Sequence, residues 1–326
     1  MKTFNLQTIS KYRAELMGVA TIMIICCHGP ANGVSVPSIV DKVVRSWGGL
    51  GVDMFLFLSG IGLYYSLRKK IILKSWYKHR YTRILVPYLL ISIPYYVFRW
   101  IVEDDTFLHL LGNITTISYW TRHQGAWFVA LLLPLYLCTP LIAKFIDGKR
   151  KRIYPTLCLC GLSVIVYYFS KSQDVSDSIS QASWHLPAFF LGYWAGKYVF
   201  EEKQIRIDVV LLVSVLIIIA YAVFMYVRLP KDYLLMIPGA IFISALLNIK
   251  SESIVNKALS FMGGVSLESY LMNIYMPNVL RKIGYMEGMK DIDPNNYLFY
   301  FIVIVLGISL AYMANVISKS LIKRIG

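Results

Sequence analysis

Charged residues are scarce in this chain. Asp, Glu, Lys and Arg make up 16% of its 326 residues, whereas soluble proteins carry about 25%. Apolar residues make up 57%, and they come in blocks of roughly 17 to 23 residues, each long enough to cross a bilayer core of about 30 Å. The shortage of charge excludes an ordinary soluble domain and predicts a multi-pass membrane protein.

The chain has only five cysteines, and all of them fall within apolar stretches. They have neither the spacing of a zinc site nor that of a disulfide framework, so we expect no metal and treat them as packing residues. No small-residue cleavage site follows the first apolar segment, which is therefore expected to remain in the membrane. No internal repeat relates the two halves, which disfavours a transporter built on inverted repeats.

The apolar blocks predict an all-α fold of about ten membrane spans within one integral-membrane domain, residues 1–326. The net charge of +15 does not indicate nucleic acid, because the cations lie in alternate loops. One set of loops holds more than twice as many Lys and Arg residues as the other, which places both termini in the cytoplasm. The expected spans are 13–29, 48–67, 84–102, 125–146, 152–170, 183–200, 207–227, 232–248, 259–280 and 296–318.

The first span carries Arg13 near its inner end and His28 near its outer end, about 22 Å apart on a helix. Asp53 enters the second span from outside, at an expected depth similar to that of His28. A carboxylate beside an imidazole fixes its tautomer and raises its basicity, so His28 and Asp53 are candidate catalytic residues. The alternative is that both only form hydrogen bonds within the bundle.

Arg80 and Arg83 lie in the most basic loop, three residues apart and directly before the third span. On a helix they share a face, where two guanidinium groups suit a phosphate group. The alternative is that this basic loop only sets the topology and contacts anionic lipid.

Three further residues are candidates for substrate binding: Trp127, His185 and Glu268. His185 lies near the outer end of the sixth span, at about the expected depth of His28. Glu268 lies near the middle of the ninth span, where a buried carboxylate needs a partner, either structural or catalytic.

Taken together, these segments resemble the acyltransferase family 3 membrane proteins, which acylate sugars of bacterial surface polysaccharides and related acceptors. The resemblance covers most of the chain and rests on the order of its motifs. They are Tyr12-Arg13-Ala14-Glu15-Leu16-Met17-Gly18 with His28, Gly51-Val52-Asp53-Met54-Phe55, Arg80-Tyr81-Thr82-Arg83, Trp127-Phe128 and Ser266-Leu267-Glu268-Ser269-Tyr270-Leu271.

The resemblance implies that His28 is the essential histidine, that Asp53 is the acid of the second span, and that Arg80 and Arg83 are the cytoplasmic Arg-x-x-Arg. It also implies a cytoplasmic acyl-CoA donor, most commonly acetyl-CoA, with succinyl as an open alternative. The acceptor is a hydroxyl of a surface glycan or its lipid-linked precursor, and the location is the bacterial inner membrane.

The chain departs from the family pattern at three positions. Many members have Arg in place of Met17, so Arg13 is expected to act for both. Many have Arg in place of His185, and His in place of Asn273. The acceptor site is therefore less well defined by the resemblance than the donor site.

Our hypothesis is that His28 accepts a proton from the sugar hydroxyl or is itself transiently acylated. The 3′-phospho-ADP end of acyl-CoA rests on Arg80 and Arg83. The leading alternative is an exporter or flippase of a polysaccharide or lipid-linked sugar. A structural scaffold leaves the ionisable residues of the spans unexplained. Beyond the bilayer, the donor and the acceptor, the sequence identifies no partner and leaves the oligomeric state open.

Overall fold

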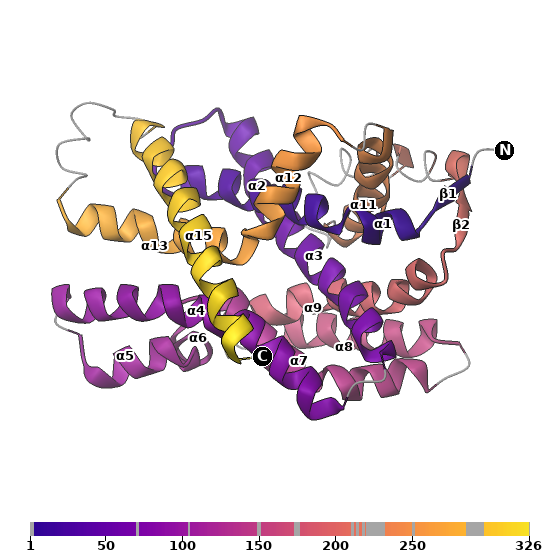
Figure 1. Cartoon of the computed structure of the whole chain (residues 1–326), viewed down its shortest axis with the longest axis horizontal. Coiled ribbons are helices and arrows are strands. Elements are labelled where there is room, and N and C mark those ends of the chain that lie inside the picture. The colour runs from indigo at the N-terminus through magenta and orange to yellow at the C-terminus, as the bar shows by residue number, and fades with distance from the viewer. Residues whose placement is uncertain are drawn as a thin grey trace.

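The computed structural model is a bundle of α-helices with almost no strand (Figure 1). The structure describes residues 3–69, 72–103, 105–148, 151–172, 177–209, 212, 215–216, 219, 232–249, 252–284 and 297–325. Within them, six helices are long and apolar enough to cross a membrane. The predicted all-α multi-pass fold is confirmed, whereas the count of ten spans remains a prediction. These six are α2 (Arg13–Ala31), α3 (Ser38–Arg68), α4 (Leu73–Val102), α7 (Trp127–Asp147), α8 (Ile153–Ser172) and α15 (Tyr297–Ile325).

Other expected spans have different outcomes. Two coincide with α9 (Asp177–Phe200) and α11 (Asp232–Ile249). The expected span at 207–227 lies largely outside the described residues. The prediction of one continuous span at 259–280 is wrong, because the chain breaks at Val265 into α12 (Ile254–Gly264) and α13 (Ser266–Lys282).

Short elements that the sequence did not predict connect the long helices. The segment between α4 and α7 forms α5 (Phe107–Ile114) and α6 (Ile117–Arg122). Near the N-terminus, β1 (Thr3–Asn5) pairs antiparallel with β2 (Gln204–Arg206) and leads into α1 (Gln7–Lys11). This pairing holds the entry to α2 against the segment that follows α9.

Helix α3 is the central helix of the bundle. All residues from 51 to 61 are buried, as expected of a helix that is apolar on every side. It packs against α2 on one side and against α9 on the other. A Cβ on Gly192 of α9 would meet the carbonyl oxygen of Phe57 at 2.1 Å. The two helix backbones therefore approach as closely as small residues allow.

The same kind of close approach joins α2 to α12. A Cβ on Gly18 would lie 2.0 Å from the carbonyl oxygen of Leu259, and one on Gly263 would lie 1.8 Å from that of Ala14. Both positions therefore require glycine. The break at Val265 follows directly after this contact, so α12 lies along the inner half of α2 and α13 takes a different direction (Figure 1).

This packing predicts a difference between two adjacent glycines. We expect Gly263→Ala to reduce the free energy of unfolding by about 1–3 kcal/mol, because the methyl group has to push α12 away from α2. Gly264→Ala is the matched control, since its Cβ would meet no atom within 4 Å. Thermal unfolding of the two purified variants in detergent measures the difference. Equal midpoints would contradict the close contact.

Candidate active site

One face of α2 connects the two ends of the bundle. Arg13, Met17 and Ile24 all line an internal cavity. On an α-helix their spacing of four and seven residues places them in one stripe, and His28 lies four residues beyond Ile24 in the same stripe. His28 therefore follows the cavity at about 6 Å along the helix from Ile24.

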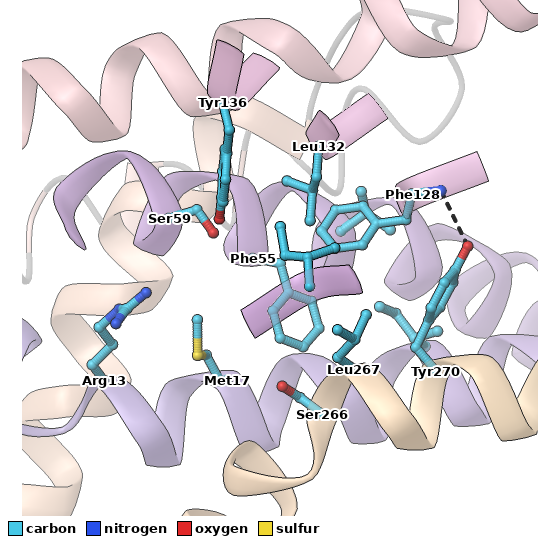
Figure 2. A pocket seen from close by; sticks show the side chains of 13 residues that line it. Arg13, Met17, Phe55, Ser59, Phe128, Leu132, Tyr136, Ser266, Leu267 and Tyr270 are labelled. Carbon is cyan, nitrogen blue, oxygen red and sulfur yellow. Dashed lines mark hydrogen bonds between the residues drawn. The ribbon is translucent and has the colours of Figure 1, made fainter. Parts of the chain in front are cut away.

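We call this internal space the apolar cavity; its volume is about 150 Å³. Its polar groups gather near Arg13, where Figure 2 shows the hydroxyls of Ser59 and Tyr136 pointing into the same end. The opposite end is closed by Phe128 and Tyr270, and the Tyr270 hydroxyl accepts a hydrogen bond from the Phe128 amide at 3.2 Å. The full lining is Arg13, Met17, Ile24, Val52, Phe55, Ser59, Ile84, Phe128, Leu132, Tyr136, Ser266, Leu267 and Tyr270.

Arg13 and Arg80 meet on the inner half of α3. Arg13 Nε donates to the carbonyl oxygen of Leu58 at 3.2 Å, and Arg80 Nη2 lies 3.5 Å from that of Gly62. Arg83 is close enough for its charge to interact with both. None of the three arginines forms an ion pair with a carboxylate among the described residues. The prediction that Arg80 and Arg83 lie together is met, and Arg13 joins them.

Arg83 faces a second, larger space, which we call the cationic cavity, with a volume of about 440 Å³. Lys319 and Lys323 of α15 line it opposite Arg83. Ser318 lines it as well, and its buried hydroxyl oxygen has no hydrogen-bond partner among the described residues. The full lining is Arg83, Pro87, Gly264, Ser266, Leu267, Glu268, Asn315, Ser318, Lys319, Ile322 and Lys323.

The two cavities meet at the first residues of α13, because Ser266 and Leu267 line both. Val265, which precedes this helix, has no capping side chain. The first amide groups of a helix lack intrahelical acceptors, so the positive dipole end of α13 lies at the junction. The break at Val265 thus places a helix N-terminus beside the cations of both cavities.

Glu268 lies in the cationic cavity and not with Trp127 and His185, where we had grouped it. Its Oε1 accepts a hydrogen bond from Asn315 Nδ2 at 2.8 Å, and Asn315 Nδ2 also donates to the carbonyl oxygen of Gly264 at 3.1 Å. Glu268 therefore joins α13 to α15 on the cationic side. This is the partner that a buried carboxylate requires.

His28 is half-buried and contacts Asn273 of α13. The ring Nδ1 and the Asn273 side-chain amide are 2.5 Å apart. The Tyr300 hydroxyl lies 3.3 Å from the same amide and also bonds to the carbonyl oxygen of Ile25. Gly29 allows the Tyr300 ring to approach α2, since a Cβ there would lie 3.1 Å from the ring.

The expectation that Asp53 orients His28 is wrong. Asp53 is fully buried, and its Oδ1 pairs with His185 Nδ1 at 2.7 Å. In the antiparallel α2–α3 pair, Gly48 faces Cys27. Asp53 therefore lies about 8 Å deeper along α3 than the level of His28.

Trp127 and His185, two of the candidates for substrate binding, lie together with their ring centroids 5.3 Å apart. His185 is thus held between the Trp127 ring and the Asp53 carboxylate. The other carboxylate oxygen, Asp53 Oδ2, is buried and has no hydrogen-bond partner among the described residues. The structure therefore has two separate histidine sites. His28 contacts the side-chain amide of Asn273, and His185 contacts the carboxylate of Asp53.

Sequence analysis missed several of these residues. Asn315, Lys319 and Lys323 recur every four residues in an otherwise apolar helix, a polar stripe that could have indicated a lined cavity. Asn273 was noted only as a departure from the family pattern. Ser59 and Tyr136 carried no signal in the sequence.

A cation-lined cavity thus lies next to an apolar one, inside a bundle with helices long and apolar enough to cross a membrane. This is the architecture of a multi-pass membrane protein. No group of three or more His, Cys, Asp or Glu side chains within the described residues could hold a metal ion.

The family model described as an acyltransferase domain, Acyl_transf_3, matches residues 16–316. The chain therefore belongs to acyltransferase family 3 and is a membrane acyltransferase. No curated protein and no solved structure matches it.

The Asp53–His185 pair predicts a specific pattern of stability. We expect His185→Ala to lower the free energy of unfolding by about 3–5 kcal/mol, because it leaves a buried carboxylate without its partner. Adding Asp53→Asn should recover part of the loss, since the amide carries no charge. Chemical unfolding of His185→Ala, Asp53→Asn and the double variant in detergent measures this. If the double variant is as unstable as the sum of the two single ones, the pair is not coupled.

Proposed function

We propose that the protein transfers a short acyl group, most simply acetyl, from cytoplasmic acyl-CoA to a hydroxyl of a surface glycan or its lipid-linked precursor. The observation that carries the proposal is the continuous path along α2. By this path we mean three sites in succession: the cationic cavity, the apolar cavity, which shares Ser266 and Leu267 with it, and His28, four residues beyond Ile24 on the same helix face.

The donor site combines charge at one end with apolar surface at the other. Arg83, Lys319 and Lys323 supply cations for the phosphates of the nucleotide end, which guanidinium and ammonium groups bind through charge-assisted hydrogen bonds. Arg80 and Arg13 extend this cationic surface inward. The pantetheine arm then passes Ser266 into the apolar cavity. Binding energy from the phosphates, which do not react, helps to hold the thioester in place.

His28 acts as the general base. Its Nε2 takes the proton of the acceptor hydroxyl while the hydroxyl oxygen attacks the thioester carbonyl carbon. The resulting tetrahedral intermediate collapses with cleavage of the C–S bond. The leaving thiolate then takes the proton from the imidazolium, which yields the ester and free CoA and restores neutral His28. Transient acylation of His28 is the alternative within the same site.

The acceptor approaches from the outer end of the bundle, in the bacterial inner membrane. Trp127 offers an aromatic face for a sugar ring, and the paired His185 supports it. The apolar cavity, about 150 Å³, favours acetyl or another short group over a long acyl chain. The CoA donor stays on the cytoplasmic side, where the Lys and Arg bias of the loops places Arg83.

The alternative function is an exporter or flippase of a polysaccharide or lipid-linked sugar. In that case the same charged residues form a path and no base is needed. The arginine cluster at the inner end together with a histidine at the outer end favours the transferase. A direct assay with a labelled donor separates the two functions.

We expect His28→Ala to lower acyl transfer from labelled acetyl-CoA to membrane glycan by about 10²–10⁴-fold, the contribution of a general base. Binding of the donor should remain. His79→Ala is the matched control, because this histidine is exposed on α4 and lines neither cavity. If wild-type membranes transfer no label from several acyl-CoA donors yet still carry glycan across the bilayer, the exporter alternative is correct.

The cationic cavity gives a second prediction. Replacing either Lys319 or Lys323 by Gln should raise the Kd for CoA by about ten- to a hundredfold, because one lost charge-assisted bond contributes about 1.5–3 kcal/mol. Arg324→Gln removes a charge from the same end of α15 but from outside the cavity, and serves as the control. Calorimetry on the protein in nanodiscs measures both. If Arg324→Gln raised the Kd for CoA by the same factor, CoA would be attracted by the positive charge of the inner surface in general and would not be bound in the cationic cavity.

A further inference from the structure

The Tyr300 hydroxyl lies between two groups that both bear an oxygen facing it. One is the backbone carbonyl of Ile25, the other the side-chain amide of Asn273 at 3.3 Å. A phenolic hydroxyl has one proton to donate and can otherwise only accept. The Ile25 carbonyl can only accept, and it is the closer of the two, so the proton lies on the Ile25 side. Two oxygens in contact without a proton between them would repel.

The Tyr300 oxygen must therefore accept a hydrogen bond from Asn273. The oxygen and nitrogen of an amide occupy interchangeable positions, and their assignment follows from their partners. The Asn273 nitrogen thus faces Tyr300, and the Asn273 oxygen faces His28. All heavy atoms keep their places, and each hydrogen bond in the chain then has one donor and one acceptor.

An amide oxygen beside His28 Nδ1, 2.5 Å away, requires that Nδ1 carries the proton. In neutral imidazole the other ring nitrogen, Nε2, then has the free lone pair. The hydrogen bonds run from His28 to Asn273, from Asn273 to Tyr300 and from Tyr300 to Ile25. Because Ile25 and His28 are on the same helix, the chain begins and ends on α2, with α13 and α15 supplying its middle.

We propose that Asn273 and Tyr300 are positioning residues that hold neutral His28 in its Nδ1–H tautomer, with Nε2 as the free base. The importance of this tautomer for catalysis rests on the proposed function. The tautomer itself can be observed without any activity. An amide in this position orients the imidazole without placing a charge beside it, unlike the carboxylate that pairs with His185.

The test is nitrogen NMR of the full-length protein in nanodiscs with ¹⁵N-labelled histidine, at a pH of about 8, where imidazole is neutral. His28→Gln identifies the His28 signals by their loss. We expect the wild type to show His28 with Nδ1 protonated. Tyr300→Phe should shift it toward a mixture of tautomers, because the amide is then free to rotate. Tyr297→Phe is the control. Tyr297 lies on the same helix as Tyr300, but its hydroxyl donates to the backbone carbonyl of Ser35 and does not contact Asn273.

Kinetics give the second readout. Tyr300→Phe should lower kcat by roughly two- to tenfold, because only the fraction in the correct tautomer acts as a base. The KM for the acyl donor should stay unchanged, and Tyr297→Phe should have no such effect.

A wild-type His28 with Nε2 protonated would overturn the inference, as would a Tyr300→Phe spectrum identical to that of the wild type. The proposed function fails on a different result, which is wild-type membranes that transfer no label. Acyl transfer that survives His28→Ala would refute only the role of His28 as the base.

Discussion

A polar side chain inside a membrane bundle must find its partner within the protein, because the bilayer core offers none. This constraint accounts for most of the interior. Glu268 is held by Asn315, and Asp53 is held by His185. Arg13 uses the backbone carbonyl of Leu58 instead of a carboxylate. Because carbonyls satisfy only part of a guanidinium, Arg13 keeps donors available for an anionic ligand.

The glycine contacts of α2 put these partners within reach. With Gly18 and Gly263 in backbone contact across α2 and α12, the start of α13 is fixed beside the middle of α2. The side chains of Met17 and Leu267 then line one cavity, and Asn273 reaches His28 two turns further along α13. A larger residue at either glycine would shift α13 and separate Asn273 from His28. Packing at the inner half of the bundle therefore sets the geometry at its outer half.

The sequence predicts features that depend on a single helix. Apolar length identifies α2, α3, α4, α7, α8 and α15, and the helical repeat places Arg13 and His28 on one face. Both signals are local, so no knowledge of neighbouring helices is needed.

The features that it failed to predict depend on pairs of helices. Depth estimates placed Asp53 level with His28, yet the offset between α2 and α3 is set by which glycines meet, and that offset separates them by about 8 Å. The break at Val265 has the same origin. The pair Gly263-Gly264 precedes this break, but it is a weak signal for a break, because glycine is also common within continuous membrane helices.

The departures from the family pattern now have a physical explanation. Where many members have a permanently charged arginine, this chain has His185, whose ring forms a hydrogen bond with the buried Asp53 carboxylate. At the other site, where many members have a second histidine, Asn273 supplies an amide that cannot titrate. Asn273 contacts the His28 ring without placing a charge or a second titratable group beside it. The two replacements together keep the His185–Asp53 pair separate from His28, so the proposed role of His28 as a base does not depend on that carboxylate.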